Sequence, residues 1–424
     1  MSPFGYVDRT LHAESVPLEA IARAVGTPCY VYAASAMRAR YRAFARAFAE
    51  MRVLVCYAIK ANANLAVIRL LADEGAGADT VSGGEIARAR AARVPPERIV
   101  YAGVAKTDEE IRYALAEGIL QLNVESTQEL TRVAALAKAM GRTAPVALRI
   151  NPDVAAGTHD KISTGRRDDK FGIPWDEAHE AFALAARLEG VEPVGLHLHI
   201  GSQITRLEPF AAAYARAVEL FASLRARGLP LRRLDLGGGF GVRYRDEEPI
   251  APEDLAALVR ERTAGLDCEL LLEPGRALVA EAGVLLAAVI DRKETAGRRF
   301  LILDAGMNVL MRPALYGAWH EVLPLREPEA EAPLLPMDVV GPICESSDVL
   351  GRDRRLPPLA HGDLVAIMGA GAYGAVMASC YNARPLPAEI LVEGDRFAVI
   401  KPRREPALQF ADERIPGWLG QGDP

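Results

Sequence analysis

The stretch Val53-Leu-Val-Cys-Tyr57 begins the part of the chain that decides the fold. It is a short apolar run rich in β-branched and aromatic residues, which is typical of a buried strand. Ala58-Ile59-Lys60-Ala61-Asn62 follows it, and Leu65–Glu74 then repeats apolar residues at helical spacing. A strand followed by a helix is the unit from which parallel sheets are built.

The same unit recurs through the middle of the chain. Further strands are expected at Ala78–Val81, Ile99–Ala102, Leu120–Val124, Val146–Ile150, Gly195–Ile200, Arg233–Leu236 and Glu269–Leu272. Further helices are expected at Gly84–Arg93, Asp108–Glu117, Ser126–Ala139, Trp175–Leu188, Pro209–Arg227 and Pro252–Ala264. Eight strands, each but the last followed by a clear helix, predict a TIM-like (β/α)8 barrel over residues 35–278. A doubly wound open sheet is the alternative, but polar residues after the strands favour the barrel.

The character of the chain changes after Glu273. Short strands are expected at Val284–Ile290, Phe300–Leu303, Asp338–Gly341, Asp363–Ile367, Glu389–Glu393 and Arg396–Ile400, with little helical periodicity between them. Residues 279–424 therefore predict a second, mainly β domain, a sandwich or barrel. Residues 1–34 are expected to join it, because Cys29–Tyr32 has the composition of a strand. We expect Leu323–Pro336 to be a surface loop and the unpatterned stretch Asn151–Pro174 to be a lid or interface element.

Composition excludes several classes of function. Lys and Arg total 50 against 56 Asp and Glu, a net charge of −6, which does not favour binding to nucleic acids or membranes. Apolar runs such as Val284–Ile290 are far shorter than the roughly 20 residues of a membrane span. Asp8 and Arg9 lie where a signal peptide would need an apolar core. The 5 cysteines are widely spaced and form no CxxC pair, so we expect a reduced, cytoplasmic protein.

Polar residues after the barrel strands suggest where chemistry occurs. Lys60 follows the first strand, and the mouth formed by strand ends is where barrels carry active sites. Gly237-Gly238-Gly239-Phe240-Gly241 follows the seventh strand, and consecutive glycines expose backbone N–H groups to an anion. Glu273-Pro274-Gly275-Arg276 follows the eighth strand. The loops after these two strands often hold phosphate in barrels.

Two histidines, His197 and His199, are expected on the sixth strand with spacing two, facing the same side. A metal site is one interpretation, but the sequence offers no convincing third ligand, and we expect none. A flat imidazole could instead stack on a flat cofactor, with Ser202 donating to a phosphate. Pyridoxal 5'-phosphate fits this combination of a lysine nucleophile, a phosphate cradle, an imidazole ring and the carboxylate of Glu273. The cofactor needs a carboxylate at its pyridine nitrogen.

The second domain carries three further polar motifs. Cys344-Glu345-Ser346-Ser347-Asp348 places a thiol among acids, which suits a proton donor better than a nucleophile. Met311-Arg312-Pro313-Ala314-Leu315-Tyr316 offers an arginine suited to a substrate carboxylate. Gly369-Ala370-Gly371-Ala372-Tyr373-Gly374 is a glycine-rich turn with one phenol. Each motif taken alone is also compatible with an ordinary turn.

Together these motifs resemble the fold-type III pyridoxal-phosphate decarboxylases, from Gly5 to Arg384. The matching segments are YAIKAN at 57–62, HIGSQ at 199–203, GGGFG at 237–241, EPGR at 273–276, MRPALYGAWH at 311–320, CESSD at 344–348 and AGAYG at 370–374. The CESSD and MRPALY segments favour the branch of the family that acts on diaminopimelate. The alternatives are a related decarboxylase that acts on ornithine, arginine or a carboxylated polyamine, and a non-catalytic regulatory homologue. Fold analogy alone would also admit a racemase or a dehydratase.

The resemblance implies a role for each motif. Lys60 would form the Schiff base with the cofactor and His199 would stack on its ring. The residues expected to hold the phosphate or the pyridine nitrogen are Ser202, Gly238, Gly239, Glu273, Gly275, Arg276 and Tyr373. Those expected to bind substrate are Arg276, Arg312, Tyr316, Glu345 and Tyr373. Cys344 would donate the proton, reaching the site from the second subunit of a homodimer, and the reaction would release carbon dioxide from a small amino acid.

Overall fold

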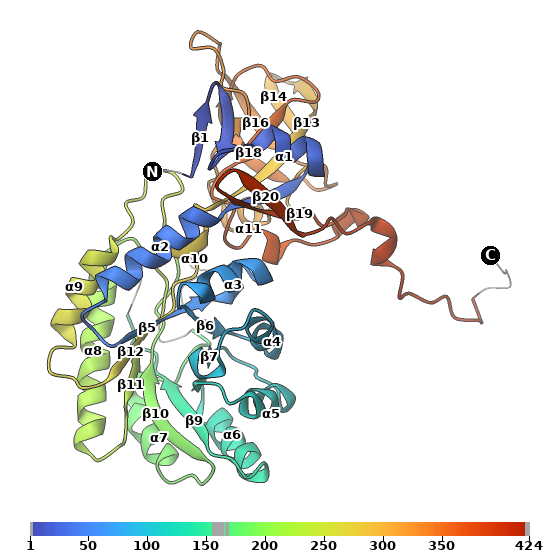
Figure 1. Ribbon diagram of the computed structural model, residues 1–424. Coiled ribbons are helices and arrows are strands. Elements are labelled where there is room, and N and C mark those ends of the chain that lie inside the picture. The colour runs from blue at the N-terminus through green and yellow to red at the C-terminus, as the bar shows by residue number, and fades with distance from the viewer. Residues whose placement is uncertain (1–2, 155–164, 166–168, 420–424) are drawn as a thin grey trace. The chain divides into compact units, whose positions relative to one another are not determined.

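The computed structural model describes residues 3–154, 165 and 169–419, and these form two compact units. Unit 1 consists mainly of Ala33–Gly283 together with Gly371–Val376 (Figure 1). Unit 2 consists of Phe4–Tyr32, Val284–Ala370 and the chain from Met377 onward. The expected division into 35–278 and the remainder does not anticipate that a short segment near Tyr373 returns to unit 1.

Unit 1 is a closed barrel of parallel strands in sequence order, in which the last strand pairs back with the first. Its strands are β5 (Val53–Ala58), β6 (Gly77–Thr80), β7 (Ile99–Tyr101), β8 (Gln121–Val124), β9 (Ala144–Arg149), β10 (Val191–His197), β11 (Arg233–Asp235) and β12 (Glu269–Leu272). The predicted barrel is therefore confirmed, and the open-sheet alternative is wrong. Leu54, Cys56, Val100 and Leu271 form a buried cluster of its core.

Helices surround the strands of unit 1. They are α3 (Leu65–Asp73), α4 (Gly83–Ala91), α5 (Asp108–Glu117), α6 (Thr127–Ala139), α7 (Ala178–Ala185), α8 (Leu207–Ala226) and α9 (Pro252–Arg262). After β12 there is only the short helix α10 (Arg276–Val279). The helix α2 (Ala34–Ala47), which precedes β5, packs against α3, α9 and α10. The helix α2 therefore takes the position that a helix after β12 would have in the outer ring. The sequence analysis did not predict this helix.

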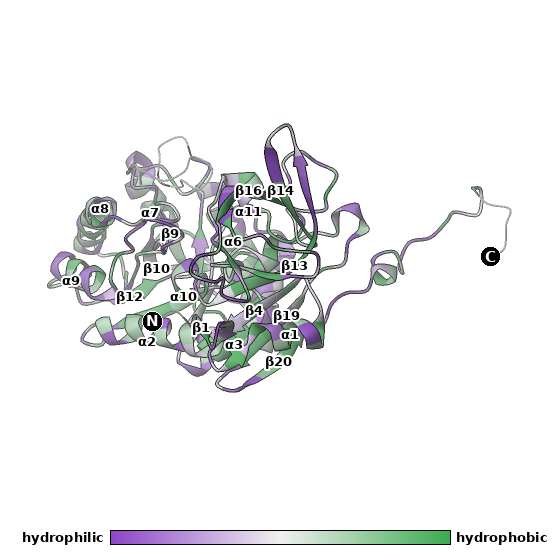
Figure 2. Ribbon diagram, turned by 90° about the horizontal axis from the view of Figure 1, so that it is seen from above, coloured by the Kyte–Doolittle hydropathy of each residue, from purple (hydrophilic) through white to green (hydrophobic). Residues whose placement is uncertain are grey.

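Local signals explain where these helices begin and end. Thr107 and Glu110 form a capping box at the start of α5, and Gly118 ends that helix in the left-handed conformation. Ser82 and Ser126 cap α4 and α6 by accepting a backbone N–H. Hydrophilic and hydrophobic residues alternate around α8 and α9 (Figure 2), as expected of helices with one buried face.

Unit 2 combines a three-stranded sheet with a larger mixed sheet. Its strands are β1 (Phe4–Val7), β2 (Thr10–Ala13), β3 (Val16–Pro17), β4 (Cys29–Ala33), β13 (Gly283–Thr295), β14 (Arg298–Leu303), β15 (Val322–Pro324), β16 (Leu335–Val340), β17 (Val349–Leu356), β18 (Leu364–Ile367), β19 (Ala388–Glu393) and β20 (Arg396–Lys401). It also carries α1 (Leu18–Val25) and α11 (Arg312–Tyr316).

All the strands expected in unit 2 are present, whereas β1, β2, β3, β15 and β17 were missed. The strand β17 contains three arginines and an aspartate, and this charge hides the alternation of a strand. The expected loop Leu323–Pro336 is shorter than predicted, because β15 and β16 take its two ends.

The expected lid Asn151–Pro174 lies largely outside the described residues, including His159 and Lys161. Its described ends are anchored to the barrel: Ile173 N–H donates to Arg149 O at 2.8 Å, and Gly172 N–H donates to Glu125 at 2.8 Å. Within the described part of the chain, no helix has the length and apolarity that crossing a membrane requires.

Candidate active site

Lys60 lies just beyond the first barrel strand, in a single 3-10 turn of residues Ile59–Ala61. Its Nζ donates to Asp79 Oδ2 at 2.6 Å, and Asp79 is completely buried on β6. Burial alone would lower the pKa of Lys60, but the nearby Asp79 and Glu273 carboxylates raise it overall. Burial, and then the charge of Glu273, raises the pKa of Asp79 to about 7. Without a bound cofactor, the amine is therefore held as an ammonium by Asp79.

The glycine loop after β11 packs so closely on its neighbours that side chains are excluded. A Cβ on Gly238 would lie 2.1 Å from the carbonyl oxygen of Glu273. A Cβ on Gly239, which has φ +96°, would lie 2.2 Å from the carbonyl oxygen of Gly201. These positions accept only glycine, so the loop presents bare backbone at the barrel mouth, as an anion site requires.

Arg276, the first residue of α10, contacts three parts of the same mouth. Its guanidinium donates to Ser202 Oγ at 3.0 Å and to Tyr244 Oη at 2.9 Å. Its Cζ lies 4.7 Å from the ring centroid of Tyr373, a cation–π contact. The side chain of this cation is largely buried, with 7% of the residue exposed, and it contacts two hydroxyl groups and an aromatic ring.

Tyr373 is placed by the short segment that returns to unit 1. Its backbone N–H donates to Ala61 O at 2.7 Å, and Asn62 Nδ2 donates to Gly371 O at 3.1 Å. A Cβ on Gly371 would lie 1.9 Å from Val279 O, so this segment needs glycine to dock. The turn that carries Lys60 and the segment that carries Tyr373 thus hold each other.

Glu273, at the end of β12, is buried to 3% exposure. Its Oε2 lies 3.3 Å from His197 Nε2, and its Oε1 accepts from Asn123 Nδ2 at 3.5 Å. Burial would raise the pKa of Glu273, but His197 and Lys60 lower it to about 2. Glu273 is therefore a carboxylate, as the partner of a protonated pyridine nitrogen must be.

His199 lies just past the end of β10, not on the strand as expected, and its side chain is 17% exposed. Gly238 N–H donates to its Nδ1 at 3.3 Å, so the ring proton of the neutral form is on Nε2. Burial, assisted by Arg149 and Lys60, lowers the pKa of His199 well below its usual value. A neutral ring at the barrel mouth suits stacking on a flat group.

The predicted substrate residues of unit 2 lie on and after α11. Arg312 is buried to 5% exposure, and its Nη1 donates to His320 Nε2 at 2.8 Å. His320 Nδ1 in turn donates to Met368 O at 2.7 Å, which fixes the ring. Tyr316 follows Arg312 by four residues, so the two lie on one face of the helix. His320, missed as a contact of Arg312, lies at the end of the MRPALYGAWH segment.

Cys344 and Glu345 lie in an exposed turn of unit 2. Asp348 organises this turn by accepting from the backbone of Ile343 and Met307, each at 2.6 Å. Glu345 accepts from Tyr381 Oη at 2.5 Å and from Ser347 Oγ at 3.0 Å. These hydrogen bonds lower the pKa of Glu345, so it is an anion that could bind an ammonium group. Tyr381 gave no signal in the sequence, because it lies outside every motif.

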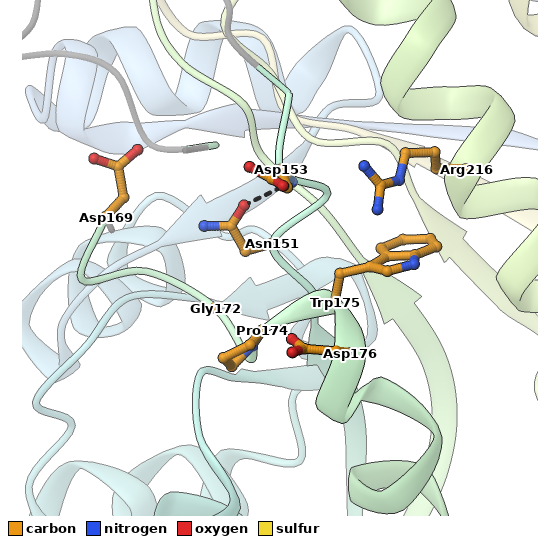
Figure 3. A pocket seen from close by; sticks show the side chains of 8 residues that line it. All are labelled: Asn151, Asp153, Asp169, Gly172, Pro174, Trp175, Asp176 and Arg216. Atoms are coloured by element: carbon orange, nitrogen blue, oxygen red, sulfur yellow. Dashed lines mark hydrogen bonds between the residues drawn. The ribbon is translucent and has the colours of Figure 1, made fainter. Parts of the chain in front are cut away.

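A cavity of about 210 Å³ beside the described part of the 151–174 stretch was not predicted (Figure 3). Arg216 of α8 lies 4.3 Å above the ring of Trp175, and Asn151 accepts from Asp153 N–H at 2.9 Å. None of the residues that line it belongs to the predicted site. Five of its eight lining residues, Asn151, Asp153, Asp169, Gly172 and Pro174, belong instead to the expected lid or interface element.

Unit 1 thus brings together all the predicted residues of the barrel mouth. They are Lys60, His199, Ser202, Gly238, Gly239, Glu273, Gly275, Arg276 and Tyr373. Unit 2 carries the other predicted residues, Arg312, Tyr316, Cys344 and Glu345. The arrangement in unit 1 offers an amine, an anion cradle with a cation beside it, a neutral ring and a buried carboxylate.

Comparison with known proteins agrees with this arrangement. Residues 34–280 match the family model described as the pyridoxal-binding domain of pyridoxal-dependent decarboxylases. The chain belongs to the pyridoxal-dependent decarboxylase family. It is 49% identical over 415 residues to diaminopimelate decarboxylase of Pseudomonas aeruginosa, covering 98% of this chain and 99% of that protein.

Solved structures of such decarboxylases have the same fold. Diaminopimelate decarboxylase of Helicobacter pylori, complexed with L-lysine, superposes with a TM-score of 0.90 at 43% identity, over 93% of this chain and 99% of that one. The enzyme of M. jannaschii, also with L-lysine, gives a TM-score of 0.93 at 38% identity, over 98% of each chain.

The cofactor of this decarboxylase family is pyridoxal phosphate, and the residues of the barrel mouth fit it. The glycine loop leaves no room for a Cβ, which is the form of a phosphate cradle. Arg276 and Ser202 add a cation and a hydroxyl at the same place. Glu273 is held as a carboxylate, and Lys60 lies close enough to it that each charge shifts the pKa of the other group.

Proposed function

We propose that this decarboxylase converts meso-2,6-diaminopimelate to L-lysine and carbon dioxide. The observation that carries the proposal is the buried, oriented Arg312 in a chain that matches diaminopimelate decarboxylases over its full length. Ornithine and arginine have no second carboxylate, so a buried arginine for that group would serve no purpose with them. Diaminopimelate has one at each end.

The residues of unit 1 would act at the carbon that loses carbon dioxide. Bound pyridoxal phosphate supplies an electron sink for the pair released when the carbon–carboxylate bond breaks. Lys60 would hold the cofactor through its amine, and Asp79 would accept a hydrogen bond from that amine whenever it is free. Glu273, ionised, would retain a proton on the pyridine nitrogen, and the neutral His199 would support the ring face.

The residues of unit 2 would bind the end of the substrate that does not react. The molecule is nearly symmetric, so choosing the D-configured end requires groups that recognise the L-configured one. Arg312 and Tyr316 would bind the far carboxylate, and Glu345 would bind the far ammonium group. Arg276 and Tyr373, which contact each other within unit 1, are further residues proposed to bind substrate.

We further infer that the protein works as a homodimer in the cytoplasm. Cys344 is exposed on unit 2, so its thiol is available to a second copy, where it would return a proton to the decarboxylated carbon. The other four cysteines, Cys29, Cys56, Cys268 and Cys380, are free as well, which suits a reducing compartment.

Product analysis tests the substrate directly. The purified protein, loaded with cofactor, is incubated separately with meso-diaminopimelate, arginine and ornithine, and amine products and carbon dioxide are measured. Lysine and carbon dioxide in equal amounts are expected from diaminopimelate only. If agmatine or putrescine is the main product, the substrate is arginine or ornithine instead of diaminopimelate. If none of the three substrates gives a product, the protein is better explained as a non-catalytic homologue.

A further inference from the structure

The carboxylate of Glu273 lies in surroundings that oppose its charge. It is buried to 3% exposure, and one side-chain atom from each of His197, Asp235 and Glu273 lies within 4.8 Å of the others. Asp79 is also completely buried, and its carboxyl group raises the pKa of Asp235. A buried carboxyl beside other carboxyls ordinarily keeps a proton. Some neighbour must therefore stabilise the anion.

Among the described residues, side-chain nitrogen atoms of Asn123, His197 and His199 lie within 4 Å of the Glu273 carboxylate, and they differ in whether they can donate to it. Asn123 Nδ2 is 3.5 Å from Oε1, but it also donates to Asp235 Oδ2 at 3.3 Å. His199 Nδ1 is 3.9 Å from Oε2, but it accepts the Gly238 N–H and so has no proton to give. His197 Nε2 lies 3.3 Å from Oε2.

The proton on His197 is fixed by its neighbours. An ionised carboxylate only accepts hydrogen bonds, so His197 Nε2 must carry a proton whether the ring is neutral or charged. The ring is buried to 1% exposure, so water does not compete for that proton. Among the described residues its Nδ1 meets no hydrogen-bond partner, so the side-chain hydrogen bond of the ring is the one from Nε2 to Glu273.

We propose that His197 is a positioning residue that keeps Glu273 ionised and aimed at the pyridine nitrogen of bound pyridoxal phosphate. The inference rests on the proposed role of Glu273. The groups that face this carboxylate are Lys60, Asp79, Asn123, His197, His199 and Asp235, with Arg149 beside the histidines. Of these, His197 has the largest lowering effect on the pKa of Glu273.

The test compares His197→Leu with His197→Gln, which retains an N–H donor but carries no charge. His179→Leu is the matched control, because this histidine lies on α7 in the outer helix layer. Four quantities are measured: the dissociation constant for pyridoxal phosphate, the pH titration of cofactor absorbance without substrate, the infrared carboxyl signal of the cofactor-free protein, and the pH profile of kcat.

We expect His197→Leu to weaken cofactor binding about 10- to 100-fold, as loss of a hydrogen bond to a buried charge does. A protonated carboxyl signal should appear near neutral pH, and it should vanish in the double variant His197→Leu/Glu273→Gln. The acid limb of kcat should move to higher pH by a unit or more. His197→Gln should recover most of the affinity, and His179→Leu should resemble the parent protein.

Unchanged affinity, absorbance titration and infrared signal in His197→Leu would overturn the inference. If His197→Leu does not fold, His197→Asn takes its place, since its amide is too short to reach Glu273, and the same shifts are expected. A fully active Glu273→Gln variant would instead refute the role of Glu273 itself. If Glu273→Gln is inactive while His197→Leu changes none of these measurements, only the role of His197 is refuted.

Discussion

Lys60 and Asp79 are joined by a 2.6 Å hydrogen bond at the edge of the barrel mouth. If this amine is the attachment point of the cofactor, Lys60→Ala should abolish turnover and the visible absorbance of the bound cofactor. Lys138→Ala is the control, because Lys138 is exposed on α6 and pairs only with the surface residue Glu189. Near-normal turnover of Lys60→Ala without added amine would contradict the assignment.

The lowered pKa of Glu273 predicts a pH-dependent contribution to stability. An unfolded glutamate has a pKa of about 4.3, against about 2 in the folded protein. Between these values the unfolded chain binds more protons, so the stability supplied by Glu273 is present above about pH 4.3 and is lost as the pH falls. Relative to Glu273→Gln, the cofactor-free parent should lose on the order of 1–2 kcal/mol between pH 6 and 3.

Urea unfolding of both proteins across this range measures the difference. Parallel curves for the parent and Glu273→Gln would mean that folding does not shift the pKa of Glu273, and a parent that gains stability relative to Glu273→Gln as the pH falls would mean that the folded protein keeps Glu273 protonated.

Arg312 offers a test of how the substrate is read. Arg312→Ala should raise KM for diaminopimelate strongly while leaving the affinity for pyridoxal phosphate within about twofold, because the residue belongs to unit 2. Loss of a buried charge-assisted contact typically costs about 2–5 kcal/mol. Arg299→Ala is the control, because this arginine lies near the start of β14 in the same unit with its side chain 39% exposed. Equal KM in Arg312→Ala and the parent would show that another group binds the carboxylate.

Site residues that directly follow a strand could be predicted from the sequence. The side chains within strands that form hydrogen bonds with them could not. Lys60, the glycine loop and Glu273 stand out because polar or glycine-rich segments interrupt apolar runs. Asp79 and Asn123 lie inside short buried strands, where a single polar residue has no recognisable spacing. Their roles depend on which strands become neighbours across the barrel, and that information is not local.

At the scale of elements, the glycine loop after β11 makes a sharp prediction. Gly238→Ala should weaken binding of pyridoxal phosphate at least tenfold, because the new methyl group would overlap the backbone of Glu273 and displace both loops. Gly84→Ala is the matched control, since a Cβ there meets only Ser82 Oγ at 3.7 Å and α4 should become slightly more stable. Binding is measured by titrating the cofactor-free proteins, and equal affinity in Gly238→Ala would remove the loop from the cradle.

The barrel could be predicted because its periodicity changes regularly between strand and helix, and β12 and α5 have the predicted bounds. The helix α2 could not be assigned to it, because it precedes the first strand and joins the ring only when the barrel closes. The segment near Tyr373 was misplaced for a related reason. It is held by backbone contacts to Ala61 and Val279, and such contacts leave no pattern in sequence.

At the scale of the whole molecule, the predicted catalytic groups are divided between two units, with Lys60 on one and Cys344 on the other. The proposed homodimer makes Cys344 of one copy act at the site that holds Lys60 of the other. Co-expression of Lys60→Ala with Cys344→Ala tests this arrangement, since each variant should be nearly inactive alone. Random pairing makes about half of the dimers mixed.

In a shared arrangement, each mixed dimer has one site with both substitutions and one with neither. About a quarter of the parental activity should then return, because half of the dimers each regain one of two sites. If Cys344 instead acts on Lys60 of its own chain, every site keeps a substitution and no activity returns. Mixed dimers confirmed by mass but lacking activity would therefore move Cys344 to its own chain, and high activity of Cys344→Ala alone would remove it as the proton donor.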